Sequence, residues 1–231
     1  MKSEVEEIKS RYKRRKDFPL YKYSILNPAS YLAEQEKERA IIKWIKKNYI
    51  LPVADKKFLE IGCGTGNNIY TFLKLGFKPE NIYANELLDD RFFAAKKNLP
   101  KDVKLINGNA LDIELPDNSF DVVFQSMVFS SILDKNFKRD LAIKLFKLTK
   151  PGGGILWYDF IYNNPNNPDV SGVSLKEVKD LFNLEPSYMQ KITLAPPIAR
   201  MITKIHPSMY TLLNSIHIFR THLLLWIKKR E

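Results

Sequence analysis

The chain has 231 residues, of which 45% are hydrophobic and 27% charged, and its formal net charge is +11 at pH 7. This length can bury one good hydrophobic core, so we expect one α/β domain with additions. The single cysteine, Cys63, excludes an internal disulfide and a zinc site built from several cysteines, and we expect no metal. No apolar run reaches the ~18 residues of a membrane-spanning helix. The first 16 residues lack the apolar centre of a secretory signal, so we expect a cytoplasmic protein.

The positive charge is concentrated in the two flanks of the chain. Residues 1–57 hold 15 basic and 8 acidic side chains, whereas residues 58–190 hold 15 and 17. Residues 191–231 hold 7 basic side chains and 1 acidic one. Basic flanks suit an anionic substrate, a membrane surface or RNA, although a solvated face has the same composition.

Two helices are predicted in the first flank. Residues 4–16 begin with acids and end with bases, an order that complements the helix dipole. Two prolines interrupt the aromatic stretch 18–28 and forbid a continuous helix through it. The second helix is expected to be capped by Ser30 and to end before Pro52. Its apolar stripe consists of Ile41, Trp44, Ile45 and Tyr49.

The most informative stretch is a short apolar run, residues 58–61, that leads into three glycines spaced one residue apart: Gly62, Gly64 and Gly66. A strand, a glycine turn and a helix place a ligand at the helix N-terminus, and glycine lets the backbone approach that ligand closely. A dinucleotide fingerprint would have a further glycine where this chain has Asn67. The pattern GxGxG, with Glu60 before it, resembles the first motif of the class I methyltransferases that use S-adenosylmethionine. A tight structural turn is the alternative interpretation.

A second strand is predicted over residues 81–86 and ends in an acid, Glu86, 20 residues beyond Gly66. A carboxylate at this position can accept hydrogen bonds from both hydroxyls of a ribose, whereas the alternative is an ordinary surface glutamate. The resemblance places Leu87, the next residue, against the adenine ring.

After a third strand over residues 103–106, residues 108–121 resemble the methyltransferase segment GDA…LPF.DNSFD, which contacts the adenine edge. Asn109 stands where the family has aspartate, and its amide oxygen can still accept a hydrogen bond from the adenine amino group. Ala110 would offer its backbone. Residues 121–126 are predicted to form a fourth strand, buried on both faces as in a parallel sheet.

The run from Lys150 to Asp159 resembles the same superfamily and is predicted to turn into a fifth strand, so the resemblance covers residues 58–160. A sixth strand is expected over residues 188–194 and a last one over 221–228, antiparallel by analogy with the family. The resemblance implies an α/β, Rossmann-like fold with a seven-stranded, mostly parallel sheet and helices on both faces. It also implies an N-terminal helical lid and a helical insertion before the last strand.

This layout divides the chain into a basic arm and helical lid over 1–52 and a methyltransferase domain over 53–231, with 196–220 as a cap-like insertion. The implied cofactor is S-adenosyl-L-methionine, and its expected contacts are Glu60, Gly62, Cys63, Gly64, Gly66, Glu86, Leu87, Asn109, Ala110, Gln125 and Tyr23. Loops at the carboxyl edge of such a sheet bind ligands. The expected substrate contacts are Phe129, Tyr162, Asn163, Asn164 and Arg200.

Methyl transfer requires alignment of acceptor, methyl carbon and sulfur, and a hydroxyl acceptor also benefits from a nearby base. Asp159 is a candidate base because of its position at the end of the fifth strand. His217 and His206 are candidates because the unperturbed pKa of histidine lies near neutrality, although a histidine in an apolar helix is more often a packing residue.

Residues 23–41, 129–134, 157–173 and 194–200 are similar to a poorly characterised bacterial group of methyltransferases often linked to surface-glycan synthesis. The expected function is therefore O-methylation of a glycan, glycolipid or other small-molecule hydroxyl. An RNA methyltransferase that uses the basic flanks is an alternative, as is a non-catalytic cofactor-binding subunit. Methyltransferases that act on exocyclic amines carry a characteristic motif after the fourth strand, and this chain lacks it. At that position the chain has the residues Gln125-Ser126-Met127-Val128.

Overall fold

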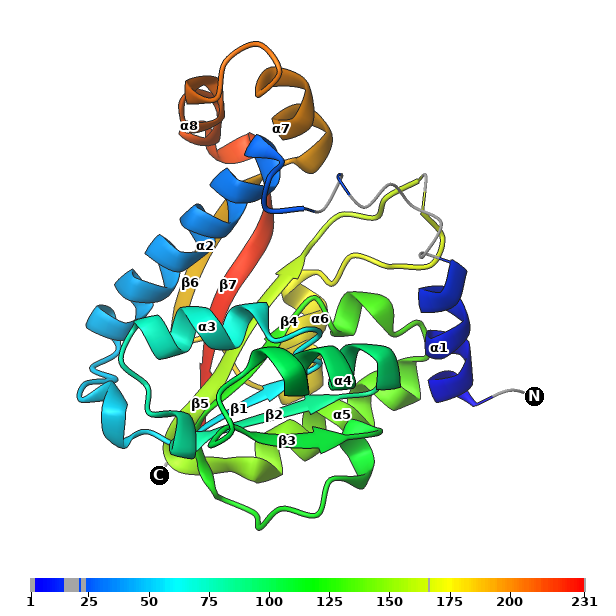
Figure 1. Ribbon diagram of the computed structural model, residues 1–231, viewed down its shortest axis with the longest axis vertical. Coiled ribbons are helices and arrows are strands. Elements are labelled where there is room, and N and C mark those ends of the chain that lie inside the picture. Colours follow the sequence, from blue (N-terminus) through cyan, green and yellow to red (C-terminus); the bar gives the residue numbers. More distant parts are fainter. Residues whose placement is uncertain (1–2, 15–20, 22–23, 166, 231) are drawn as a thin grey trace.

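The structure is a computed structural model that describes residues 3–14, 21, 24–165 and 167–230. Its centre is a seven-stranded sheet in the order β3-β2-β1-β4-β5-β7-β6, in which β7 runs antiparallel to both its neighbours. The predicted Rossmann-like fold with helices on both faces is confirmed (Figure 1). The strands are β1 (Phe58–Ile61), β2 (Ile82–Glu86), β3 (Lys104–Asn107), β4 (Phe120–Ser126), β5 (Thr149–Phe160), β6 (Tyr188–Leu194) and β7 (Arg220–Lys228).

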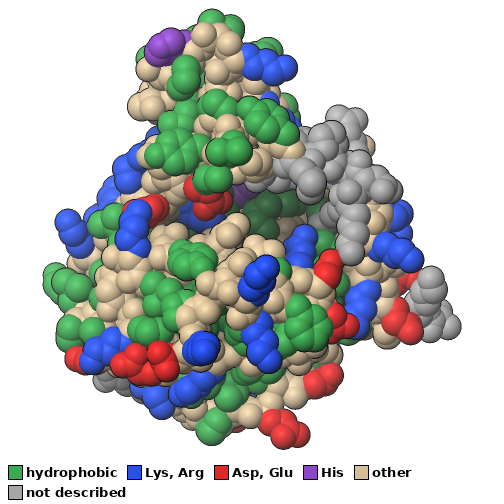
Figure 2. Space-filling model, viewed as in Figure 1, with side chains coloured by type: hydrophobic (Ala, Val, Ile, Leu, Met, Phe, Trp, Pro, Cys, Tyr) green, Lys and Arg blue, Asp and Glu red, His purple; other side chains and the backbone are tan. Residues whose placement is uncertain are grey.

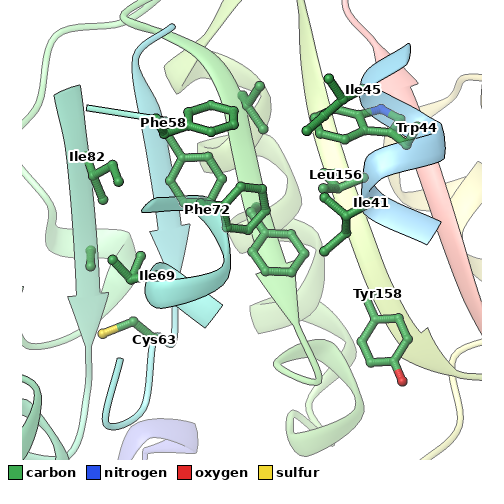
Figure 3. Packing of buried hydrophobic residues seen from close by; sticks show 14 of the residues in the cluster. Ile41, Trp44, Ile45, Phe58, Cys63, Ile69, Phe72, Ile82, Leu156 and Tyr158 are labelled. Carbon is green, nitrogen blue, oxygen red and sulfur yellow. The ribbon is translucent and has the colours of Figure 1, made fainter. Parts of the chain in front are cut away.

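Alternating residues of the central strands divide the core into two layers. Phe58 and Phe124 face one side, where α2 (Pro28–Lys47), α3 (Asn67–Lys74) and α4 (Asp89–Asn98) cover the sheet. The rings of Phe58 and Phe72 lie 4.2 Å apart between β1 and α3 (Figure 3). The other face of the sheet packs against α5 and α6 and contacts α1 at its edge. These helices are α1 (Glu4–Arg14), α5 (Lys135–Leu148) and α6 (Leu175–Phe182).

Helix α2 begins two residues earlier than Ser30, the cap expected from the sequence. The cap is Asn27, whose Oδ1 accepts a hydrogen bond from Ala29 N at 3.0 Å. Pro28 occupies the first helical position, where a residue without an N–H leaves no donor unsatisfied. Short 3-10 turns complete the connections: η3 (Val53–Asp55), η4 (Pro79–Asn81), η5 (Ala110–Asp112), η6 (Phe129–Ser131) and η7 (His217–Phe219).

Residues 196–220 form a helical unit, here called the cap, that contains α7 (Pro196–Ile202) and α8 (Ser208–Asn214) and lies beyond the start of α2 (Figure 1). A small apolar cluster joins the two: Ala29, Leu194, Ala199, Ile202 and Tyr210. Beside it, the buried carboxylate of Glu36 accepts hydrogen bonds from Thr193 N at 3.0 Å, Tyr210 OH at 2.9 Å and Asn214 Nδ2 at 2.7 Å. Helix α2, strand β6 and the cap are therefore tied together through one side chain.

Candidate functional site

The glycine turn after β1 adopts a conformation that favours glycine. Gly62 and Gly64 have φ values of 68° and 60°, in the left-handed region. A Cβ on Gly62 would lie 2.6 Å from Val128 Cγ2, whereas a Cβ on Gly64 would have nothing within 4 Å. Gly62 is thus needed for packing, and Gly64 faces open space in which a ligand can approach the backbone.

Glu86 fixes this turn to the end of β2. Its Oε2 accepts a hydrogen bond from Gly64 N at 2.7 Å, and its Oε1 accepts one from Leu88 N at 2.9 Å. The carboxylate lines a first cavity of about 200 Å³. Other residues that line this cavity include Ile61, Gly62, Leu87, Leu88, Asn109, Ala110, Met127 and Val128. A carboxylate beside an apolar slot is the combination that a ribose and a flat base require.

Asn109 lies in the wall of the first cavity, and its side chain caps η5. Its Oδ1 accepts a hydrogen bond from Leu111 N at 3.2 Å, and its Nδ2 donates to Asp112 Oδ2 at 3.1 Å. A carbonyl oxygen has two lone pairs, so one remains for a further donor. These two hydrogen bonds fix the orientation of the Asn109 amide at the cavity wall.

Helix α1 covers the outer side of the first cavity. Ile8 and Tyr12 line it, and the guanidinium of Arg91 lies 4.5 Å from the centre of the Tyr12 ring. Arg11 is buried and donates to Ser131 O at 3.2 Å, which holds the helix against η6. The first flank therefore contributes directly to the cavity.

A second cavity of about 940 Å³ lies between α2, the glycine turn and the cap. Figure 2 shows a hollow below the cap on this side of the molecule. Four residues line both cavities and mark the place where they meet: Gly62, Arg91, Ser126 and Met127. Cys63 and the predicted substrate residue Arg200 also line the second cavity. Burial raises the pKa of the Cys63 thiol, so this side chain is a neutral packing group.

Two non-glycine residues in the wall of the second cavity have left-handed backbone conformations. Met127 has a φ of 63° and Thr193 a φ of 66°. Their amides are held by Tyr158 O at 2.9 Å and by Glu36 Oε2 at 3.0 Å. Such conformations cost about 1–3 kcal/mol each and tend to occur at binding sites, where surrounding contacts fix them.

A chain of polar contacts runs from the exposed Glu34, at the second cavity, to the buried Glu60 before the glycine turn. Lys37 Nζ contacts Glu34 Oε2 at 2.7 Å and donates to Asn68 Oδ1 at 2.9 Å. Asn68 Nδ2 in turn donates to Glu60 Oε1 at 2.7 Å. Burial raises the pKa of Glu60 to about 8, and its Oε2 has no partner among the described residues. The sequence interpretation did not include Lys37 or Asn68.

His222 is a further polar residue that the sequence interpretation did not select. It is buried on β7, lines the second cavity and stacks on Tyr158. Its Nδ1 lies 3.0 Å from Thr221 Oγ1. Burial and the nearby charge of Lys37 lower the pKa of His222 to about 3, so the ring is neutral at pH 7. The sequence did contain a signal, because alternation along the last strand places His222 on the same face as Leu224 and Trp226.

Glu60 and Gly66, two of the predicted cofactor contacts, are buried and line neither cavity, and the same is true of three further predicted residues. Asp159 accepts hydrogen bonds from Ser130 N and Phe160 N, both at 3.0 Å. Burial raises its pKa to about 7. Gln125 accepts from Val128 N at 3.1 Å, and Phe129 packs against a tryptophan with ring centroids 4.4 Å apart. These side chains shape the ends of β4 and β5, because strand alternation turns Asp159 away from the face that Tyr158 occupies.

Five further predicted residues lie in exposed segments. His206 and His217 are exposed side chains of the cap. Tyr162 OH accepts from Lys191 Nζ at 3.0 Å, and Asn163 Oδ1 accepts from Gly172 N at 2.9 Å. The carbonyl of Asn164, in the same loop, accepts from Asn167 N at 3.0 Å. Tyr23 lies outside the described residues.

The residues of the two cavities fit S-adenosylmethionine, the cofactor implied by the sequence. Glu86 would hold the ribose, while Leu87 and Ala110 would contact the adenine. Gly64 leaves space for the amino-acid part at the glycine turn. Among the described residues, no cluster of three or more His, Cys, Asp or Glu side chains is arranged so that it could hold a metal ion.

Residues 59–157 match the family model described as a methyltransferase domain. An uncharacterised methyltransferase of Bacillus mycoides is 31% identical over 129 residues, which are 54% of this chain and 58% of that protein. One of Bacillus cereus is 29% identical over 153 residues, which are 63% of this chain and 69% of the relative. The chain thus spans less than two thirds of the first relative's length.

Solved structures share the fold at low sequence identity. An S-adenosylmethionine-dependent methyltransferase from Mesorhizobium loti has a TM-score of 0.60 and 14% identity, over 83% of this chain and all of the other. The geranyl diphosphate C-methyltransferase of Streptomyces coelicolor, solved with S-adenosyl-L-homocysteine, has a TM-score of 0.60 and 12% identity, over 82% and 77% of the two chains. Residues 59–157 are therefore similar to a methyltransferase domain, and the chain has the fold of the S-adenosylmethionine-dependent methyltransferases among these solved structures.

Proposed function

We propose that the protein is an S-adenosylmethionine-dependent methyltransferase whose acceptor is a hydroxyl group of a glycan, a glycolipid or another small molecule. The observation that carries this proposal is the junction of two unlike cavities at Gly62, Ser126 and Met127. The first cavity has the carboxylate and apolar wall that an adenosyl group needs. The second cavity is larger and takes the acceptor.

The polar surface of the second cavity supports a neutral acceptor. His222 is neutral, the pKa of Tyr158 is raised by burial, and Tyr158 OH lies 2.8 Å from Thr193 Oγ1. These groups can exchange hydrogen bonds with hydroxyls. The charge of Lys37 is balanced by Glu34, so the pair adds little net charge to the wall. Arg91 and Arg200 also line the cavity, so the neutral part of the wall is the one that His222, Tyr158 and Thr193 form, and this part suits a hydroxyl of a sugar or alcohol.

S-adenosylmethionine, when bound, supplies a methyl group on a sulfonium. The protein contributes alignment, because holding two reactants in the productive geometry can lower the activation free energy by about 7–11 kcal/mol. Among the polar groups that line the second cavity, we assign to His222 the role of accepting a hydrogen bond from the acceptor hydroxyl. A group whose pKa is about 3 is a weak base at pH 7, so its proposed role is to orient the hydroxyl.

An RNA methyltransferase that uses the basic flanks is the second candidate, favoured by the net charge of +11. The first flank offers fewer free cations than its composition indicates. Arg11 is paired with Glu4, and Arg14 Nη2 lies 2.5 Å from Asp169 Oδ1. A non-catalytic cofactor-binding subunit is the third candidate, and it predicts cofactor binding without turnover.

The test is a transfer assay with S-adenosylmethionine labelled in the methyl group and with lipid, glycan and RNA fractions of the source cell. The proposal predicts label in the glycan or lipid fraction. It also predicts that His222→Leu lowers incorporation while the surface variant Phe93→Ser retains it, because the Phe93 side chain is 61% exposed. Label confined to RNA favours the second candidate, and no label in any fraction favours the third.

A further inference from the structure

The cap presents a group of exposed aliphatic side chains, here called the cap tip. Within residues 196–220, all of which the structure describes, five large apolar side chains have exposed fractions between 46% and 75%: Met201, Ile205, Leu212, Ile216 and Ile218. Single exposed apolar residues are ordinary, but a group of them in one short segment marks an interaction surface. Figure 2 shows hydrophobic side chains gathered on the cap above the hollow.

The cap does not need these side chains for its own packing. Its interior is filled by Ala199, Ile202 and Tyr210, which pack against the start of α2. The hydrogen bonds of Glu36 hold Tyr210 and Asn214 in place from the other side. The five exposed side chains are therefore available for a partner.

Charge indicates what kind of partner the cap tip fits. Residues 196–220 contain Arg200, Lys204 and Arg220 and no aspartate or glutamate. Lys204 is exposed and immediately precedes Ile205. Arg200 lines the second cavity and Arg220 donates to Asn214 O and Lys191 O, so Lys204 is the cation that the cap tip presents. An aliphatic surface beside an exposed lysine and without an acid complements a bilayer that is apolar inside and has acidic headgroups.

Two other partners fit these observations less well. A second copy of the chain, related by a two-fold axis through the cap tip, would bring Lys204 toward the same lysine of its partner without an acid in the segment to pair with it. Single-stranded RNA is bound through aromatic stacking platforms and cationic grooves, whereas the exposed apolar residues of the cap tip are isoleucine, leucine and methionine.

The position of the cap tip suits a flat surface. The loop between α7 and α8, which carries Lys204 and Ile205, lies at one end of the long axis of the molecule (Figure 1). Arg200, at the base of the cap, and Ile25, before α2, line the second cavity. The cap therefore carries the cap tip and also borders the second cavity.

We propose that the cap tip docks the protein on an anionic lipid bilayer, with its aliphatic side chains in the headgroup region and Lys204 against acidic lipids. This inference goes beyond the proposed function, because docking requires neither cofactor nor turnover. In the described part of the chain, no helix is long and apolar enough to cross a membrane. Because the cap tip is formed by helices of at most seven residues and the turns between them, the proposed interaction is peripheral and reversible.

The test is vesicle flotation of the full chain without S-adenosylmethionine. Vesicles of phosphatidylcholine are compared with vesicles of equal parts phosphatidylcholine and phosphatidylglycerol. We expect binding to the anionic vesicles that weakens with added salt and is much weaker on the neutral ones. A triple variant, Ile205→Ser with Leu212→Ser and Ile218→Ser, is expected to weaken binding more than about tenfold. Lys204→Glu is expected to weaken it roughly tenfold.

Phe93→Ser and Lys101→Glu are the matched controls, since both residues are exposed on another part of the surface. Both variants should bind anionic vesicles as the parent protein does, and circular dichroism melting should show that every variant folds. Absence of vesicle binding, or binding that the triple variant retains, overturns the proposal. A dimer in light scattering that the triple variant dissociates, without vesicle binding, also overturns it and assigns the surface to self-association.

Discussion

His222 stacks on Tyr158 in the wall of the second cavity, with ring centroids 5.1 Å apart and an interplanar angle of 13°. The two residues come from neighbouring antiparallel strands, β7 and β5. Lys37 lies 5.3 Å from the centre of the Tyr158 ring on the cavity side. This cluster joins a neutral imidazole, a phenol and a paired ammonium group at the place where the acceptor is proposed to bind.

The first prediction concerns the acceptor role of His222. His222→Leu should lower kcat for methyl transfer by roughly tenfold to a hundredfold, because it removes the hydrogen bond that orients the hydroxyl. His222→Gln should retain more activity than His222→Leu, since an amide still accepts a hydrogen bond. Because the pKa of His222 is about 3, the parent rate should not show a histidine titration between pH 5 and 8. All three predictions are checked by initial rates of methyl transfer to the cell fraction that takes up label. A parent rate that decreases when the pH is lowered below 6.5, without the same decrease in His222→Gln, contradicts the assignment.

The second prediction concerns the buried carboxyl of Glu60. Its pKa is raised from 4.5 to about 8, so the folded state keeps a proton that the unfolded state loses. The resulting stabilisation is complete below about pH 4.5 and is lost as the pH rises through 8, with a slope of at most about 1.4 kcal/mol per pH unit. Glu60→Gln imitates the protonated form and should flatten this part of the stability profile. Urea unfolding from pH 5 to 8.5 measures the slope, with Glu80→Gln, an exposed carboxylate, as the control. Equal slopes in Glu60→Gln and the parent would show that Glu60 is ionised in the folded protein.

The third prediction concerns the attachment of the cap to α2. Glu36→Ala leaves Thr193 N, Tyr210 OH and Asn214 Nδ2 without their shared acceptor. Unpaired buried groups cost about 1–3 kcal/mol each. Hydrogen exchange should therefore accelerate in residues 196–220 while the central strands β1 and β4 keep their protection. Glu38→Ala, two residues along the same helix, loses only the contact with Lys74 and should leave the cap unchanged. Uniform acceleration across the sheet would mean that Glu36 stabilises the whole domain instead.

The fourth prediction separates packing from ligand access in the glycine turn. Both Gly62→Ala and Gly64→Ala place a Cβ at a positive φ, which costs about 1–2 kcal/mol. Gly62→Ala adds a clash with Val128, so it should be the less stable variant, and Val128→Ala should restore part of the loss. Gly64→Ala should be more stable than Gly62→Ala, because its Cβ meets no other protein atom. It should bind S-adenosylmethionine more weakly than the parent protein, because the Cβ enters the space proposed for the amino-acid part of the ligand. Thermal melting with and without ligand gives both quantities. Equal cofactor affinity in Gly64→Ala and the parent would place the ligand away from this residue.

The fold could be predicted from the sequence because its signals are local. The glycine turn, the acids at the ends of β1 and β2, and the alternation of the last strand each lie within a few consecutive residues. The start of helix α2 was predicted three residues too late. Asn27 and Ser30 both resemble caps, and Pro28 decides between them by fixing the first turn.

The polar groups of the second cavity could not be predicted in the same way, because their partners are distant in the chain. Lys37 meets Asn68 only after α2 has packed on the sheet. Outside the cavity, Glu36 likewise meets Asn214 only after the cap has packed on α2. For Asp159 the sequence predicts the position along the chain but not the direction of the side chain. Its place at the end of β5 can be read from the sequence. Neighbouring residues of a strand face opposite sides, however, and in the structure Tyr158 faces the cavity and Asp159 the interior.

The central claim is that the first cavity binds the adenosyl part of S-adenosylmethionine, and calorimetry with purified protein tests it most directly. The account predicts a saturable, one-to-one titration with S-adenosylmethionine and with S-adenosyl-L-homocysteine. It also predicts that Glu86→Ala loses most of this affinity while Glu80→Ala retains it. Absence of heat and of thermal stabilisation with both compounds would contradict the account, as would full affinity in Glu86→Ala.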